Sequence, residues 1–302
     1  MIKRIKLLYL LYNFFQKKKL AHNIPVYRKL GIRKKYFSPV SSKDFSKISA
    51  LNKDEIRNLF DIENSALFKR LDIESKKSIL NFEQEGYAIL QGYLSDSQVK
   101  NVNEEIDKLL NNKEVKFKRN KKIMFAIHKS GLLKSIGNNA DLIELLQSLI
   151  GGDIKLFQSI NFLSGSEQKT HSDSIHMTTY PPGGLLGVWI ALEDIQPDNG
   201  PLHYYPGSHK LPYYLNADYN NEGNFFLLGP NDYSEYEKML QQKIEQYNIE
   251  KKIFNAKKGD LLIWHANLLH GGEPHLNKEK TRKSMVFHYY NIDCVCFHEI
   301  TQ

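Results

Sequence analysis

The sequence predicts a mainly β protein, an antiparallel sandwich or barrel with helices on its flanks. From residue 153 onward, short apolar runs alternate with turn clusters such as 181–184 and 198–200. Many short strands separated by Gly and Pro turns are typical of sandwiches and barrels. The 302 residues also include 17 Tyr and 16 Phe, residue types that suit a β-rich core.

Helical patterns precede the strands. Over residues 51–85, apolar residues recur at intervals of three to four, as on one face of a helix. A glycine then introduces a short strand at 86–90. Ser95 is a good N-cap for the next helix, whose apolar stripe runs to Leu110. The last helix of this part, 141–150, ends before two glycines.

The strands of the second half are separated by one long insertion. Residues 213–250 are polar and Tyr-rich and include a helix near 234–246. An insertion of this length beside a barrel mouth is often a lid or a substrate loop. We therefore expect one domain over 51–302, with its core at 82–292. The predicted strands are 154–162, 187–192, 200–205, 252–254, 260–264 and 283–290.

Residues 1–50 are predicted to form a basic arm. The first 36 residues contain eleven Lys or Arg and no acid, whereas the whole chain has a net charge of +8. The remainder therefore carries about −3. A protein that binds nucleic acid more often has its basic charge on the folded body, so we expect no nucleic-acid partner.

The first 20 residues combine an apolar run with a cluster of lysines. The run from Leu7 to Tyr12 is shorter than the ~20 residues that span a bilayer, and no signal-peptide cleavage site follows it. Two interpretations stay open. The segment contacts an anionic membrane surface peripherally, at the inner face of the membrane, or it packs its apolar stripe on the body.

The number of cysteines indicates whether the protein works in a reducing or an oxidising compartment. The chain has only Cys294 and Cys296, too few for a disulfide framework, so a reducing, cytoplasmic compartment is expected. Their spacing places both on one face of a strand, where two small buried residues are a more ordinary interpretation than a redox or metal pair.

Two motifs suggest a metal site. In an extended segment, residues i and i+2 point to the same face, so His171 and Asp173 can present an imidazole nitrogen and a carboxylate oxygen to one ion. A second predicted strand leads to His270, which is followed by two glycines and so has little steric cover. Two His and one carboxylate on one face of a metal are the signature of non-haem Fe(II) oxygenases.

Arg282 lies twelve residues beyond His270, at the entry to a predicted strand. A guanidinium group can hold a carboxylate through two parallel hydrogen bonds. A lone arginine is usually a surface residue, so the interest of this one comes from its position relative to His270.

The stretch from Phe82 to Tyr290 resembles the phytanoyl-CoA dioxygenase family. The matching pieces are FEQEGYAILQGYLSDSQVKNVNEEIDKLL, HSD, VWIALEDIQPDNGPLHYYPGSHK and GDLLIWHANLLHGGEP followed by TRKS. They occur in the family's order and spacing and cover about two-thirds of the chain. The block 189–210 is the most specific.

The resemblance implies a double-stranded β-helix, the jelly-roll core of cupin-like proteins. It implies that His171, Asp173 and His270 form a catalytic Fe(II) centre, that 2-oxoglutarate and O₂ are cosubstrates, and that Arg282 binds the distal carboxylate of 2-oxoglutarate. Further expected contacts to 2-oxoglutarate are Gln158, Asn161, Thr281 and Gly272. The residues expected to shape the substrate pocket are His176, Tyr180 and Trp189.

Two positions refine these expectations. The family often has Ser where this chain has Gly272, so one hydrogen bond to 2-oxoglutarate is either missing or supplied elsewhere. Relatives that halogenate lack the carboxylate found here at Asp173, which therefore favours oxygen transfer over halogenation.

The sequence thus predicts an Fe(II)/2-oxoglutarate-dependent dioxygenase. It would hydroxylate a C–H bond of a small or carrier-bound organic substrate and release succinate and CO₂. One alternative is a non-catalytic jelly-roll module that binds metal and 2-oxoglutarate. A zinc hydrolase would more often use three neutral or soft ligands or a Glu-bearing helix, and the chain contains no H-E-x-x-H. The sequence assigns no role to His288 and leaves the oligomeric state open.

Overall fold

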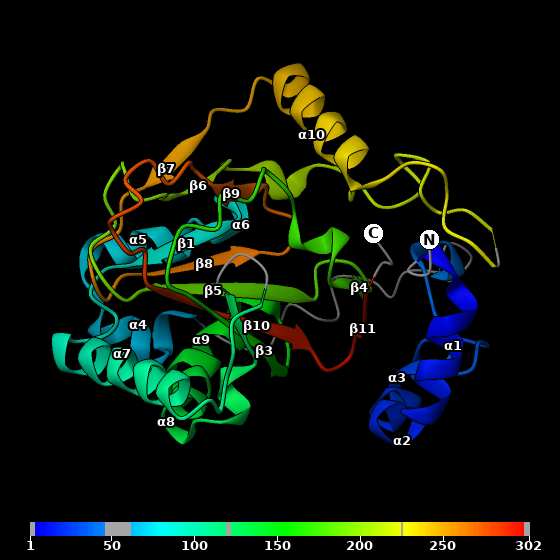
Figure 1. The fold of residues 1–302 in the computed structure, drawn as a ribbon, viewed down its shortest axis with the longest axis horizontal. Coiled ribbons are helices and arrows are strands. Elements are labelled where there is room, and N and C mark those ends of the chain that lie inside the picture. Colours follow the sequence, from blue (N-terminus) through cyan, green and yellow to red (C-terminus); the bar gives the residue numbers. More distant parts are fainter. Residues whose placement is uncertain (1–3, 46–61, 119–121, 225, 299–302) are drawn as a thin grey trace.

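The core consists of two antiparallel sheets that face each other (Figure 1). The computed structural model describes residues 4–45, 62–118, 122–224 and 226–298. The larger sheet has six strands in the order β1-β8-β5-β10-β3-β2. These strands are β1 Tyr87–Leu90, β8 Leu261–His265, β5 Leu185–Ala191, β10 Ser284–Asn291, β3 Ile154–Phe162 and β2 Lys122–Met124.

The smaller sheet lies across the barrel interior from the larger one. Trp189 and Trp264 from the larger sheet meet Leu202 and Phe254 from the smaller sheet in one buried cluster. This pair of facing sheets is the double-stranded β-helix that the resemblance implied. The smaller sheet has the order β7-β6-β9, and a separate pair joins β11 to β4. Their bounds are β7 Lys252–Phe254, β6 Leu202–Tyr204, β9 His270–Gly272, β11 Val295–Phe297 and β4 Thr178–Tyr180.

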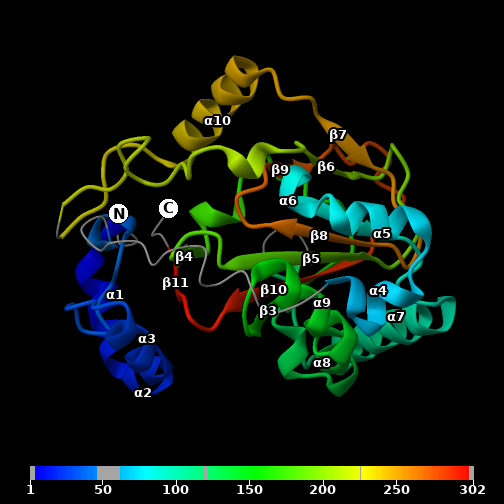
Figure 2. The ribbon, with the colours of Figure 1, turned by 180° about the vertical axis from the view of Figure 1, so that it is seen from behind.

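Helices pack on the outer face of the six-stranded sheet, as Figure 2 shows from behind. Successive residues of a strand point to opposite faces. In β5, Val188 and Ile190 therefore join the core shared with the helices, whereas Trp189 points into the barrel. The helices that contribute to this core are α4 Ala66–Arg70, α5 Ile73–Leu80, α6 Phe82–Glu85, α7 Asp96–Asn111, α8 Gly131–Gly137 and α9 Ala140–Ile150.

The local signals at helix ends are confirmed. Ser95 and Gln98 form a capping box at the start of α7, and Gly151 adopts a left-handed conformation after α9. The helical pattern predicted for 51–85 lies outside the described residues over 51–61. Its remainder forms several short helices instead of one long helix.

The predicted insertion contains α10, Tyr233–Tyr247, close to the expected helix at 234–246. Its buried residues Tyr236, Leu240 and Ile244 pack in one cluster with Ile175 and Leu269. The insertion therefore lies over the segments that carry the HSD motif and His270.

The N-terminal arm forms a helical lobe beside the barrel (Figure 1). Its helices are α1 Lys6–Phe15, α2 Lys17–Leu20 and α3 Ile24–Lys29. Val26 and Tyr27 of α3 pack with Phe45 and with Val295 of β11, so α3 attaches the lobe to the body. Within the described part of the chain, every helix is too short or too polar to cross a membrane.

Candidate metal centre

Three side chains predicted as metal ligands converge in the structure. His171, Asp173 and His270 each offer one ligand atom, and these atoms lie within 4.8 Å of one another. The backbones of His171 and His270 form an isolated antiparallel bridge with two hydrogen bonds of 2.9 Å. Asp173 begins a 3-10 turn, Asp173–Ile175, directly after this bridge. The main chain therefore brings together ligands that are about a hundred residues apart in sequence.

Backbone carbonyls fix the orientation of both imidazoles. His171 Nδ1 lies 2.9 Å from the Lys169 carbonyl oxygen, and His270 Nδ1 lies 2.9 Å from the Leu268 carbonyl oxygen. A carbonyl oxygen only accepts hydrogen bonds, so each Nδ1 carries the proton and donates it. Each Nε2 is therefore the unprotonated nitrogen that can bind a metal, the usual arrangement for a ligating histidine, and at His171 this nitrogen accepts from Gln168 Nε2 at 3.0 Å, a contact that a metal would replace.

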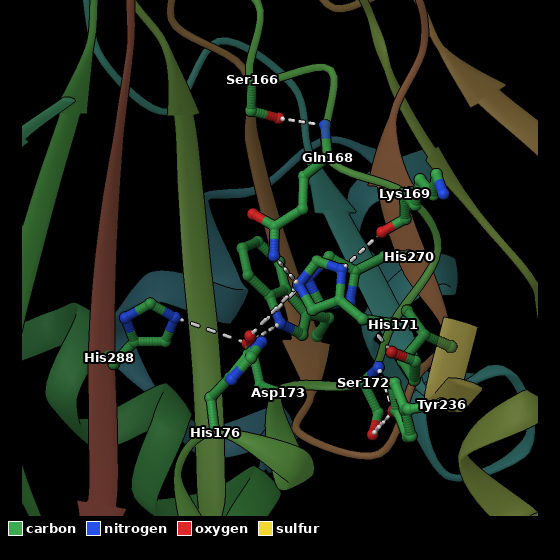
Figure 3. A network of polar contacts seen from close by, with 12 residues as sticks. Ser166, Gln168, Lys169, His171, Ser172, Asp173, His176, Tyr236, His270 and His288 are labelled. Carbon is green, nitrogen blue, oxygen red and sulfur yellow. Dashed lines mark hydrogen bonds and ion pairs between the residues drawn. The ribbon is translucent and has the colours of Figure 1, made fainter. Parts of the chain in front are cut away.

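The carboxylate of Asp173 is held between the imidazoles and the sheet. Its Oδ1 lies 3.9 Å from His171 Nε2 and 3.8 Å from His270 Nε2. Its Oδ2 accepts a 2.7 Å hydrogen bond from Trp264 Nε1 and lies 3.4 Å from His288 Nε2. Figure 3 shows Asp173 between the two imidazoles and His288, which extends towards it from β10.

A glycine positions the tryptophan that binds Asp173. Trp264 on β8 lies directly opposite Gly187 on β5. A Cβ atom at Gly187 would lie 2.2 Å from the Trp264 ring, so only glycine leaves room for the indole in this orientation.

Burial and neighbouring side chains together set the protonation states of His171 and Asp173. Burial and the nearby His270 lower the pKa of His171 well below its ordinary value, so this imidazole is neutral. For Asp173, burial raises the pKa, but the neighbouring His270 and His288 outweigh it and hold the pKa well below the usual range. Neutral imidazoles and an ionised carboxylate are the forms that bind metal ions.

A buried cation lies at the other end of the same pocket. Arg282 is 2% exposed, and burial lowers its pKa to about 10. Its Nε donates to the Gly200 carbonyl at 3.1 Å, and one terminal nitrogen donates to Ser284 Oγ at 2.6 Å. No described carboxylate forms an ion pair with it. A buried charge without a counterion is costly, so this end of the pocket fits an anionic ligand.

The pocket between Arg282 and the three metal-ligand residues has a volume of about 80 Å³. Besides Trp264 and His288, sequence reasoning missed the polar lining residues Lys122, Ser166 and Gln168. Lys122 Nζ donates to Gln168 Oε1 at 3.2 Å, and Gln168 Nε2 lies 3.0 Å from His171 Nε2. Burial lowers the pKa of Lys122. The pocket therefore contains two basic groups and one carboxylate.

Four of the other predicted residues lie in or near the pocket. Trp189 lines it and stacks on the guanidinium of Arg282, 5.2 Å from its ring. Gly272 adjoins it, and a Cβ atom there would lie 2.6 Å from Ser166 Oγ. Gln158 is on the pocket side of β3, opposite His288, but it is not among the lining residues. His176 lies beside His171, with ring centroids 5.8 Å apart, and contacts Tyr233 of α10 at 3.1 Å.

The other three predictions need correction. Ile160 and Phe162 line the pocket, so Asn161 points to the opposite face of β3, towards the helices. Thr281 is exposed, and its hydroxyl donates to Glu193 at 2.6 Å. Tyr180 stacks on Phe45 of the arm, with centroids 4.5 Å apart. Strand alternation alone could have shown that Asn161 faces away from the pocket. It could not have placed Thr281 and Tyr180, because their partners Glu193 and Phe45 are distant in sequence.

A second network, which the sequence did not reveal, joins the two segments that carry the ligands. His203 of β6 lies with Nε2 2.8 Å from Thr170 Oγ1 and with Nδ1 2.7 Å from Glu273 Oε1. Thr170 precedes His171, and Glu273 follows β9. One side chain of the smaller sheet therefore bridges both ligand segments.

A jelly-roll core with two histidines and one carboxylate converging at its interior defines a class of non-haem metal proteins. Within that class, residues 82–284 match the family model of phytanoyl-CoA dioxygenase (PhyH). The match covers two-thirds of the chain, and the protein belongs to this family.

Known proteins agree with this assignment. Phytanoyl-CoA dioxygenase domain-containing protein 1 of Rattus norvegicus is 26% identical over 174 residues, which are 55% of this chain and 56% of the relative. The match thus spans only about half the length of that relative. Ectoine dioxygenase of Stutzerimonas stutzeri is 25% identical, over 76% of this chain and 79% of its own. The solved non-heme alpha ketoglutarate dependent carbocyclase SnoK from nogalamycin biosynthesis shares the fold, with a TM-score of 0.61 at 16% identity over 76% of this chain and 88% of its own.

Proposed function

We propose that the protein is an Fe(II)/2-oxoglutarate-dependent dioxygenase. It hydroxylates a C–H bond of a small or carrier-bound organic substrate and releases succinate and CO₂. One observation carries this proposal: a pocket with three convergent metal ligands at one end has, at the other end, a buried arginine without a counterion. The pocket thus matches a metal and a dicarboxylate together.

The donor set fits ferrous iron. Two imidazoles and one carboxylate, all at most 6% exposed, form the facial triad that leaves three coordination positions for other ligands. The bound iron and 2-oxoglutarate would supply the oxygen activation. The protein's part is to hold the ligands, orient the cosubstrate and exclude water from the pocket.

The residues at the far end of the pocket would bind the cosubstrate. Arg282 keeps one terminal nitrogen for the distal carboxylate, because its other nitrogens donate to Gly200 and Ser284. Lys122 adds a second positive charge in the same pocket. Ser166 Oγ lies where a side chain at Gly272 would extend, so we propose that this hydroxyl supplies the hydrogen bond that a serine at 272 would give.

The insertion would control access for the substrate. Tyr236 Oη of α10 accepts from Ser172 N at 3.2 Å and lies 3.2 Å from Ser172 Oγ, and Glu237 pairs with Lys169 at 3.0 Å. Tyr233 reaches His176, which lies against His171. We therefore expect the substrate to contact the pocket near His176 and α10. The ectoine and phytanoyl-CoA relatives support both a free small molecule and a carrier-bound acyl group.

The two cysteines support a cytoplasmic location. Cys294 directly precedes β11 and Cys296 lies within it, and both are free thiols. Burial raises the pKa of each thiol to about 12, so neither is a reactive thiolate at neutral pH.

The test uses protein purified without oxygen. Adding Fe(II) and then 2-oxoglutarate should produce a weak visible charge-transfer band, and His171→Ala should abolish it. His128→Ala, which changes an exposed histidine away from the pocket, is the matched control. Candidate substrates are then screened for substrate-dependent succinate release. A normal band without succinate release for any substrate class would favour the non-catalytic module, and no band at all would refute both readings.

A further inference from the structure

The first helix of the arm has its apolar face turned outward. α1 has no buried residue. Its inner side carries Lys6, Tyr9, Leu10 and Asn13, which are half-buried. Its outer side is apolar or aromatic at every position, with exposed fractions from 42% to 80%. These exposed residues are Leu7, Leu8, Leu11, Tyr12, Phe14 and Phe15.

Polar contacts hold the start of this helix on the body, and Phe14 near its end packs edge-on against Phe37, with ring centroids 5.8 Å apart. Ile5 forms a β-bridge with Leu227 of the insertion. Lys6 N donates to the Phe226 carbonyl at 2.8 Å, and Lys6 Nζ donates to the Glu222 carbonyl at 2.7 Å. Figures 1 and 2 both show the tip of the insertion beside the start of α1. The outer face is therefore fixed in place and open to a partner.

The insertion extends this apolar surface. Phe226 is 60% exposed and Leu227 is 47% exposed, and the bridge to Ile5 places both beside α1. We call the outer side of α1 together with Phe226 and Leu227 the docking surface. Two segments more than 200 residues apart in sequence contribute to it. The exposed apolar surface therefore extends beyond one helix.

Basic charge borders the docking surface. Lys17, Lys18 and Lys19 follow α1 directly and are exposed, and no ion pair to a described carboxylate neutralises them. The first 36 residues contain no acid at all. An apolar, aromatic helix face beside lysines is the pattern of helices that lie in the interface of an anionic membrane.

We propose that the docking surface binds the surface of an anionic lipid bilayer. A helix of ten residues is about 15 Å long, half the ~30 Å thickness of the hydrocarbon core, so α1 lies along the interface. Its aromatic residues suit the headgroup region. The inference concerns the arm and does not rest on the proposed oxygenase activity.

The experiment measures binding of the full chain to vesicles of phosphatidylcholine alone and of phosphatidylcholine with 30% phosphatidylserine by co-sedimentation. We expect binding to the anionic vesicles only, weakened at 0.5 M NaCl. The double variant Leu11→Glu, Phe15→Glu should lose at least about tenfold in affinity. The matched control is Ile73→Glu, which changes a residue on α5 that is as exposed as Phe15, at 80%, and should bind like the parent chain.

A second pair of variants tests the charge. Replacing Lys17, Lys18 and Lys19 by Gln should weaken binding more than about tenfold, whereas replacing the exposed Lys116, Lys129 and Lys134 by Gln should have little effect. Because all these residues are exposed, the variants should keep the parent circular dichroism spectrum. Equal binding to neutral vesicles, or equal binding by the Leu11/Phe15 variant, would overturn the proposal. So would a dimer that this variant dissociates in light scattering, because a second copy would then cover the surface.

Discussion

At the residue scale, Asp173 uses its two carboxylate oxygens for different partners. Oδ1 faces the two imidazoles, while Oδ2 accepts from Trp264 Nε1 at 2.7 Å. Trp264→Phe removes this donor and keeps an aromatic ring. Loss of a hydrogen-bond partner of a metal ligand typically costs 10- to 100-fold in metal affinity. We therefore expect the Fe(II) affinity of this variant to fall by about tenfold or more. Anaerobic calorimetric titration with Fe(II) measures it.

Trp189→Phe is the matched control for that variant. Trp189 is also buried and lines the same pocket, but its Nε1 has no hydrogen-bond partner among the described residues. It should keep the Fe(II) affinity of the parent chain. If both variants lost affinity equally, the effect would come from packing, and the role assigned to the Trp264 hydrogen bond would be wrong.

Ser166 and Gly272 form a second residue-scale pair. A hydrogen bond to a charged group contributes about 1.5–3 kcal/mol, so Ser166→Ala should weaken 2-oxoglutarate binding by roughly tenfold or more. A side chain at Gly272 would meet Ser166 Oγ, so the two hydroxyls compete for one place. The double variant Ser166→Gly, Gly272→Ser should therefore recover most of the affinity. Titration of the anaerobic Fe(II) charge-transfer band with 2-oxoglutarate reports both changes.

Two comparisons make this test specific. Ser166→Gly alone should bind as weakly as Ser166→Ala, so recovery in the double variant is due to the new serine. Fe(II) affinity should stay constant throughout, because neither residue is a metal ligand. Unchanged 2-oxoglutarate binding in Ser166→Ala would show that this hydroxyl does not contact the cosubstrate.

At the element scale, the sequence predicted those strands and helices whose signals are local. The runs at 154–162 and 252–254 and the helix near 234–246 match β3, β7 and α10, because periodicity and turn residues determine them. The short strands β2, β4 and β9 were not predicted. Each has three residues and is defined by its pairing with another strand, β3, β11 and β6 respectively.

The same distinction separates the site residues that were predicted from those that were missed. His171 and Asp173 form a motif within three residues. Lys122, Trp264 and His288 lie on three different strands, and only the order of strands in the larger sheet brings them to one pocket. Strand alternation predicts which face a residue occupies but not which distant side chain it meets.

The bridge made by β6 leads to a prediction about the smaller sheet. His203 contacts Thr170 and Glu273 at 2.8 and 2.7 Å and so joins the segments of both histidine ligands. His203→Ala should loosen their relative position and lower Fe(II) affinity by about tenfold. Glu273 keeps its contact with Lys251 at 2.9 Å, so the variant does not leave an unpaired carboxylate. Calorimetric titration with Fe(II) measures the change.

His209→Ala provides the comparison for that variant. His209 follows β6 in the same connection but contacts the Glu83 carbonyl at 3.1 Å, away from the ligand segments. Both variants should lower the melting temperature slightly, and only His203→Ala should lower Fe(II) affinity. Metal affinity that changed equally in the two would argue for a general loss of packing.

At the scale of the whole molecule, the arm and the pocket are separate in position and in charge. The first 36 residues carry about +11, whereas the rest of the chain carries about −3 overall and gathers Arg282 and Lys122 in one pocket. The insertion touches both, through Leu227 at the arm and Tyr236 at the metal segment. Its contacts thus connect the docking surface and the proposed active site within one chain.

The charge balance of the pocket predicts how its ligands influence each other. Asp173 opposes two basic groups, Arg282 and Lys122, and a divalent metal would raise the excess of positive charge further. 2-Oxoglutarate carries two negative charges, so it should bind at least about tenfold more tightly once the metal is present. The coupling is reciprocal, so the cosubstrate should raise Fe(II) affinity by the same factor. Anaerobic calorimetry in both orders of addition measures the two factors, and Arg282→Met should keep the metal affinity of the parent chain while losing the coupling.

At about 100 times Kd, bound 2-oxoglutarate should add about 2.7 kcal/mol to the free energy of unfolding and raise the melting temperature by several degrees. Equal 2-oxoglutarate affinity with and without metal would mean that the two ligands do not share this pocket.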